Sequence, residues 1–316
     1  MELAVEVISK FGRAGIVRDG KAVGCDHVAM GNVLIVGDIH GNTSHALSLI
    51  QVAVRQECAK VFAVGDFGAW EHMHSGRRYF DVVNKAAKKA GVTVYFLDGN
   101  HDKSSLVHEL YGQQRDDEGF LICRKFLRFA PRGHRWEWEG TTFAAFGGAR
   151  STDKGWRLAR EARKQEQSAK RAYGSGRKRM SAGTLWFPEE EMTDAELDAL
   201  LIADSSPVDV LLSHDKPRAS TPKFNRKSKP ECFPNQDRIQ TVLETLRPGL
   251  HVHGHLHYRY TEMLPCGDGQ WTRVEGLAAD PEASSHPAYS SDQAWLVLPL
   301  PYAAAAGELV SEPAAG

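Results

Sequence analysis

The segment Asn32-Val-Leu-Ile-Val-Gly-Asp-Ile-His-Gly-Asn42 decides the fold class of this chain. Its first five residues form a short apolar run, which predicts a β-strand. The turn that follows carries Asp38 and His40, a carboxylate and an imidazole two residues apart. Open α/β sheets gather their ligands at the carboxyl ends of the strands. The segment therefore predicts a layered α/β fold with a functional site at this strand end.

Outward from this segment, short apolar runs alternate with stretches of helical periodicity, as in other layered α/β proteins. Further strands are expected at 61–64, 92–97, 208–212, 250–253 and 295–298, with a hairpin of 135–139 and 141–146. Helical stripes are expected over 46–54, 79–90 and 239–246. Gly91 indicates a helix C-terminus, and a capping box from Thr193 to Glu196 opens a helix that ends near Ala203.

The composition is that of a soluble globular protein, with 316 residues of which 42% are hydrophobic and 25% charged. We find no run of about 18 apolar residues, so we expect no membrane span. The N-terminus lacks the basic start and apolar stretch of a secretory signal, which favours a cytoplasmic location. The five cysteines are odd in number and show no CxxC spacing, which argues against a disulfide framework and a thiolate zinc site.

One α/β domain is expected over residues 31–302, preceded by an N-terminal extension (1–30) and followed by a disordered tail (303–316). Two basic insertions interrupt it, near 157–180 and 216–230, although the whole chain has a net charge of −1. They suggest an anionic substrate or partner, while solvated loops are the more common meaning of such runs. Because the first insertion carries no metal-ligand candidate, we expect its removal to leave the chemistry intact.

Five polar blocks fall at the carboxyl ends of the expected strands. They are Gly37–Asn42, Gly65–Gly68, Gly99–Asp102, Ser213–Asp215 and Gly254–His257. Together they offer carboxylate, imidazole and amide groups without sulfur, a donor set that suits Mn, Fe, Zn or Ni, with Mg less favoured by so many imidazoles. The carboxylate of Asp66 can bridge two cations about 3.5–4 Å apart, and two such ions form a clamp for phosphate.

In this order the blocks resemble the calcineurin-like metallophosphoesterases, whose pattern is Asp-x-His, Gly-Asp, Gly-Asn-His-(Asp/Glu), His and Gly-His-x-His. The resemblance covers residues 33–257 and implies a two-sheet α/β sandwich (αββα) of the metallo-dependent phosphatase type. The stretches 131–135, 147–149 and 186–191 also resemble a branch of small enzymes from actinobacteria and their phages.

The resemblance implies a role for each block. One metal ion would be bound by Asp38, His40 and His257, the other by Asn100, His214 and His255, and Asp66 would bridge the two. His101 would act as general acid near the leaving-group oxygen, with Asp102 orienting its imidazole.

One block departs from the protein Ser/Thr phosphatase branch of this family, which continues into Asp-Arg-Gly. Here the chain reads Gly65-Asp-Phe-Gly-Ala-Trp-Glu71, so the phosphate-clamping arginine of that branch is missing at this place. A protein phosphatase is therefore not favoured.

The reaction expected is hydrolysis of phosphomonoesters or phosphodiesters by a hydroxide that bridges the two metals, acting on a phosphorylated small molecule or nucleotide. The basic insertions leave a metal-dependent nuclease acting on DNA or RNA as an alternative. A non-catalytic binding scaffold on the same fold is a third hypothesis, but it would need lost ligands and none is lost.

Two further groups of residues are expected to pack rather than to bind. His251 and His253 alternate with Val252 in a strand, so strand packing is favoured over metal ligation. Core and hairpin packing is also favoured over base stacking for a set of large aromatic residues: Trp136, Trp138, Trp156, Trp186 and Phe187.

Overall fold

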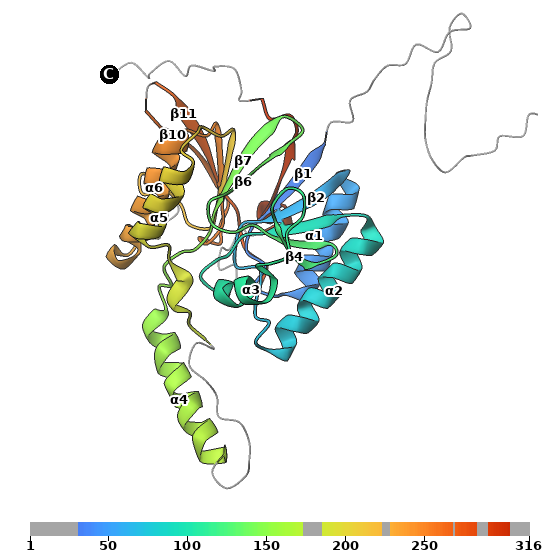
Figure 1. Ribbon diagram of the computed structural model, residues 1–316, viewed down its shortest axis with the longest axis vertical. Coiled ribbons are helices and arrows are strands. Elements are labelled where there is room, and N and C mark those ends of the chain that lie inside the picture. Colours follow the sequence, from blue (N-terminus) through green and yellow to red (C-terminus); the bar gives the residue numbers. More distant parts are fainter. Residues whose placement is uncertain (1–30, 173–184, 223–227, 268, 283–289, 304–316) are drawn as a thin grey trace, which may run out of the picture. The chain divides into compact units, whose positions relative to one another are not determined.

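The computed structural model describes residues 31–172, 185–222, 228–267, 269–282 and 290–303 (Figure 1). The expected N-terminal extension and the tail from residue 304 onward lie outside these ranges, as do parts of both basic insertions. The domain boundaries at these ends therefore stay predictions.

Two six-stranded mixed sheets form the centre of the described chain. The first has the order β12-β1-β2-β3-β5-β4, with β1, β2, β3 and β5 parallel and the outer strands antiparallel to their neighbours. Its strands are β1 (Asn32–Val36), β2 (Cys58–Ala63), β3 (Thr93–Phe96), β4 (Leu121–Arg124), β5 (Leu127–Phe129) and β12 (Trp295–Pro299).

The second sheet has the order β10-β11-β9-β8-β7-β6, with the four inner strands parallel. Its strands are β6 (His134–Trp138), β7 (Thr141–Phe146), β8 (Val210–Ser213), β9 (Leu250–His253), β10 (Tyr260–Pro265) and β11 (Trp271–Gly276).

Helices cover the outer face of each sheet (Figure 1). The first sheet carries α1 (Thr43–Arg55), α2 (His74–Ala90) and α3 (Ser104–Tyr111), and the second carries α5 (Asp194–Ala203) and α6 (Phe233–Leu246). A further helix, α4 (Lys154–Ala172), extends away from the sheets. The layers are thus helix, sheet, sheet, helix, which confirms the predicted αββα sandwich.

Alternation along β1 shows how the sequence builds these layers. Val33 and Ile35 point between the two sheets and pack with apolar residues of the second sheet such as Phe143. Leu34 and Val36 point the other way, into the cluster formed with α1 and α2. A strand buried on both faces reads as a continuous apolar run, which is why this segment stands out in the sequence.

The expected strands and helices are all present, with ends that differ by a few residues, and the capping box of α5 is formed as predicted. Several elements lacked a readable pattern, namely α3, α4, β4, β5, β10 and β11. Strand β5 has only three residues, which is too short for a recognisable pattern. Helix α4 carries no continuous apolar stripe, since the side chain buried at its middle turn is the charged Glu161. The structure therefore places a helix where the sequence indicates a basic insertion. Among the described residues, no helix has the length and apolar character needed to cross a bilayer.

Candidate active site

The predicted ligands converge because strand ends from both sheets meet. Asp38 and His40 follow β1, Asp66 follows β2 and Asn100 follows β3. From the second sheet, His214 follows β8, and His255 and His257 follow β9.

Four of these side chains form one compact cluster. Donor atoms of Asp38, His40, Asp66 and His257 all lie within 4.8 Å of one another. His257 Nε2 is 3.1 Å from Asp38 Oδ2, and His40 Nε2 is 3.3 Å from Asp66 Oδ2. This cluster combines the predicted ligands of the first ion with the predicted bridging carboxylate.

The remaining predicted ligands lie on the other side of Asp66. His214 Nε2 is 3.5 Å from Asp66 Oδ1 and 3.0 Å from Asn100 Oδ1. The rings of His214 and His255 are 5.0 Å apart, and the backbone N–H of His255 donates to Asp38 Oδ1. The two oxygens of Asp66 therefore face the two groups of ligands separately.

The residues present fit metal ions. Asp38 and Asp66 are both buried, and among the described residues Asp66 Oδ2 has no hydrogen-bond partner. Buried carboxylates this close together are costly unless positive charge compensates them. Burial lowers the pKa of the nearby His214, but the charges of Asp66 and Asp38 and the hydrogen bonds to Asp66 and the Val64 carbonyl together outweigh it and raise that pKa to about 10. The centre therefore attracts cations, and its nitrogen and oxygen donors are those of a divalent metal site.

Backbone strain is concentrated at the predicted ligands. His40, Asp66, His255 and His257 have φ of 50°, 45°, 65° and 60°, in the left-handed region that non-glycine residues seldom occupy. Such strain persists only where the surroundings hold it, and it gathers at functional sites. The chain is also tightly packed against the ligands here, because a Cβ at Gly254 would lie 2.1 Å from Asp38 Oδ1.

The Asp102 carboxylate makes contacts that the sequence does not predict. It accepts four backbone hydrogen bonds, from the N–H groups of Phe67 and Gly99 to Oδ2 and of Gly68 and Ala69 to Oδ1. These bonds tie the loop after Asp66 to the loop after β3. Asp102 therefore braces the two ligand loops, and another group contacts the imidazole that it was expected to orient.

That group is Arg157, at the start of α4. Its Nη2 lies 2.5 Å from His101 Nδ1 and 2.7 Å from His101 Nε2. Burial lowers the pKa of His101 to about 4, the charge of Asp66 opposes this and the guanidinium of Arg157 adds to it. The basic segment therefore contacts the predicted general acid through Arg157, and the effect of removing the segment stays a prediction.

Two more residues support predicted ligands, and sequence reasoning missed both. Ser151 Oγ accepts from Asn100 Nδ2 at 2.9 Å, and Asp280 Oδ2 lies 2.9 Å from His40 Nδ1. Such partners fix the orientation of a metal ligand. Asp280 follows β11. If the sequence had allowed β11 to be predicted, a search for polar residues after strand ends would have found Asp280. We see no sequence signal for Ser151.

The residues expected to pack mostly do so. His251 and His253 are buried in β9, where they contact Ser213 and Tyr260. Trp136, Trp138 and Phe187 are buried. Trp156 is different: it is 59% exposed on α4, so the packing prediction is wrong there.

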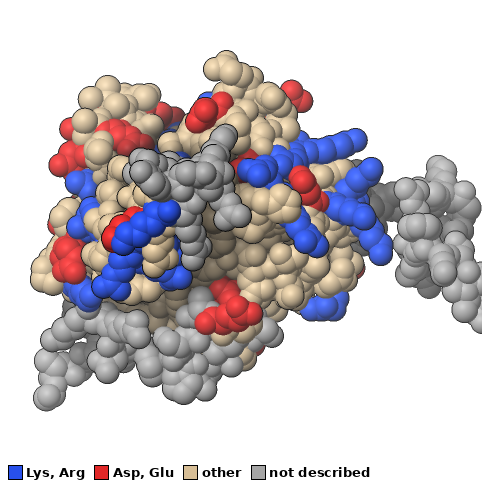
Figure 2. Space-filling model, turned by 90° about the horizontal axis from the view of Figure 1, so that it is seen from below, with Lys and Arg blue, Asp and Glu red and all other residues tan. Residues whose placement is uncertain are grey.

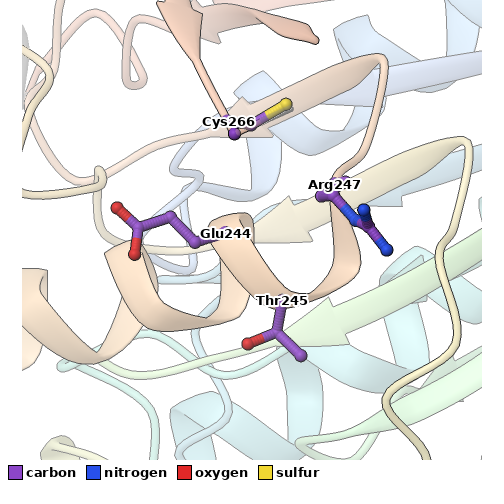
Figure 3. Close-up of a pocket in the computed structure, with 5 residues that line it drawn as sticks. Glu244, Thr245, Arg247 and Cys266 are labelled. Atoms are coloured by element: carbon purple, nitrogen blue, oxygen red, sulfur yellow. The ribbon is translucent and has the colours of Figure 1, made fainter. Parts of the chain in front are cut away.

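A pocket of about 330 Å³ lies elsewhere, where the end of α6 meets the turn after β10 (Figure 3). Glu244, Thr245, Arg247, Cys266 and Gly267 line it. None of the predicted metal ligands is among them, so this pocket and the ligand cluster are separate features.

Comparison with solved structures finds distant similarities. The chain is similar to phosphopantetheinyl hydrolase from Mycobacterium tuberculosis, with 19% identity, coverage of 88% of this chain and 99% of that one, and a TM-score of 0.42. It is also similar to a dimetal phosphatase from Danio rerio, with 15% identity, coverage of 79% and 88%, and a TM-score of 0.45. Comparison with curated proteins finds no match. A family model described as calcineurin-like phosphoesterase matches residues 31–259.

Proposed function

Because this chain belongs to the calcineurin-like phosphoesterase family and is a metal-dependent phosphoester hydrolase, we propose that it works with two divalent ions held at the strand ends of the two sheets. Asp38, His40 and His257 would hold one ion, and Asn100, His214 and His255 the other, with Asp66 shared between them. The position of Asp66 carries this proposal, since one of its oxygens contacts His40 and the other His214.

When bound, the two ions would neutralise charge on the phosphoryl oxygens and activate the attacking water. The protein keeps the ligands in place around them. Ser151 and Asp280 hold the side chains of Asn100 and His40, and Asp102 holds the loop that carries Asp66. Manganese, iron, zinc and nickel all suit this donor set, and magnesium suits it less.

We assign His101 to protonation of the leaving oxygen. Its backbone N–H donates to Asp66 Oδ1 at 2.7 Å, and its Nε2 lies 3.7 Å from Asp66 Oδ2. The ring therefore borders the shared carboxylate and is 24% exposed, so a substrate bound there can reach it. General acid catalysis from such a position typically contributes about 10²–10⁴-fold to the rate.

The substrate we favour is a phosphomonoester or phosphodiester of a small molecule or nucleotide, in the cytoplasm. A nuclease is the second candidate, and the side chains on helix α4 favour it. Figure 2 views the molecule from the end to which α4 extends, and Lys and Arg side chains gather on both sides of this face. On α4, Arg160 stacks on the exposed ring of Trp156 at 4.8 Å. Basic and aromatic side chains together suit single-stranded nucleic acid.

A substrate screen tests the proposal. Purified protein loaded with Mn²⁺ is assayed on p-nitrophenyl phosphate, bis-p-nitrophenyl phosphate, cyclic nucleotides, dinucleoside polyphosphates and single-stranded DNA. We expect hydrolysis of at least one ester, lost with a chelator and restored by Mn²⁺. Failure on every substrate with Mn²⁺, Fe²⁺, Zn²⁺ and Ni²⁺ would remove the proposal, and cleavage of DNA alone would favour the nuclease.

A further inference from the structure

Arg157 is a cation that α4 brings back to the active site. It lies in the first turn of that helix, and its side chain is only 13% exposed although the helix extends away from the sheets. Arg160, one turn further along, is exposed. The side chain of Arg157 is therefore mostly buried, whereas that of Arg160 on the same helix is in solvent.

The guanidinium of Arg157 is anchored by two of its three nitrogens. Nε donates to Asp153 Oδ1 at 2.7 Å, and Nη1 donates to the carbonyl of Leu185 at 3.2 Å. The third nitrogen, Nη2, faces His101. A neutral imidazole has one nitrogen that can accept a hydrogen bond, whereas Nη2 carries two hydrogens. Arg157 is therefore held with spare donor capacity directed at the site.

The distance from Arg157 to the shared carboxylate is short. His101 Nε2 is 2.7 Å from Arg157 Nη2 and 3.7 Å from Asp66 Oδ2. His101 Nε2 thus lies between the guanidinium of Arg157 and the carboxylate of Asp66. A phosphoryl group would bind over that carboxylate. Arg157 is therefore placed to reach an oxygen of that group.

The described loop after Asp66 does not supply the same charge. The loop after Asp66 runs through Phe67, Gly68, Ala69 and Trp70, which carry no charge. The first arginine of the following helix, Arg77, donates to the carbonyl of Glu71.

We propose that Arg157 binds the third non-bridging oxygen of a phosphomonoester and so gives this site a preference for phosphomonoesters over phosphodiesters. This inference rests on the proposed function. A monoester has three non-bridging oxygens, of which two suffice for a pair of metal ions, and the third is left for another cation. A diester carries its second organic group at that position, so it offers Arg157 no charged oxygen. Guanidinium groups suit phosphate because their parallel N–H groups match its oxygens.

Two substrates with the same leaving group test the preference: p-nitrophenyl phosphate and methyl p-nitrophenyl phosphate, with Mn²⁺-loaded protein. For Arg157→Ala we expect kcat/KM to fall by about 10- to 100-fold on the monoester, the effect of one hydrogen bond between charged groups. On the diester we expect a fall of less than about threefold by the same reasoning. Arg157→Lys should retain part of the monoester activity, and Arg163→Ala, an exposed control on the same helix, should change neither value.

Binding gives an independent readout, by calorimetric titration of the Mn²⁺-loaded protein with inorganic phosphate and with dimethyl phosphate. Arg157→Ala should weaken binding of inorganic phosphate and leave dimethyl phosphate unchanged. Equal losses on both esters, or no loss on either, would overturn the inference. If the wild-type protein hydrolyses neither ester, the proposed function fails, and the two titrations still decide whether Arg157 recognises the third oxygen.

Discussion

Replacement of Asp102 by Asn separates two roles for this carboxylate. The structure shows four backbone N–H groups donating to it, at 2.7 to 3.0 Å. In Asp102→Asn the remaining carbonyl oxygen can keep two of these bonds. The new NH₂ group faces the other two donors and cannot accept from them.

The cost follows from those two orphaned donors. A buried N–H group that loses its partner costs about 1–3 kcal/mol, so Asp102→Asn should lower the free energy of unfolding by about 2–6 kcal/mol. The measurement is urea denaturation of the metal-free protein, followed by intrinsic fluorescence, with exposed Asp117→Asn as the control. The control should leave the unfolding free energy within about 0.5 kcal/mol of the wild-type value.

An orienting role for Asp102 on His101 predicts a different result. Turnover would then fall while the unfolding free energy stayed close to that of the wild type. A stable Asp102→Asn variant with slow turnover would refute the bracing role derived from these hydrogen bonds.

Three further substitutions test the groups around the ligands. His101→Ala should keep its metal content yet lose about 10²–10⁴-fold in rate on alkyl phosphates. The loss should be smaller on p-nitrophenyl phosphate, because its leaving group needs little protonation. Equal losses on both substrates would show that His101 is not the general acid. Ser151→Ala should weaken binding of one Mn²⁺ by about 10- to 100-fold in competition with a chelator, because the Asn100 amide loses its partner, and unchanged affinity would contradict this. Asp280→Asn should weaken Mn²⁺ binding similarly through His40, and an unaltered titration would show that His40 needs no support.

Strand ends made the fold and the ligand cluster predictable. An apolar run such as Val33–Val36 is buried on both faces, and the polar turn after it must then lie at the edge of a sheet. The sequence pattern therefore predicts both that these turns meet and which donors they bring. It contains no information on φ, so the strained backbone at His40 and Asp66 appears only in the structure.

Contacts made by helix α4 were beyond sequence reasoning. A basic stretch with little apolar character is typical of a solvated segment. The contact of Arg157 with His101 depends on where the helix starts and on the anchors from Asp153 and Leu185. The local hydrophobic periodicity of the sequence predicts neither the helix start nor these anchoring contacts. The resemblance implies that Asp102 orients His101, whereas the hydrogen bonds of Asp102 in the structure go to backbone groups of two loops.

Metal stoichiometry tests the shared carboxylate most directly. Protein dialysed after loading with Mn²⁺ is analysed for metal per chain, for the wild type, for Asp66→Ala and for the exposed control Asp117→Ala. We expect two ions in the wild type and in the control, and clearly fewer than two in Asp66→Ala together with loss of hydrolysis. Two ions and normal turnover in Asp66→Ala would contradict a dinuclear site built on this residue.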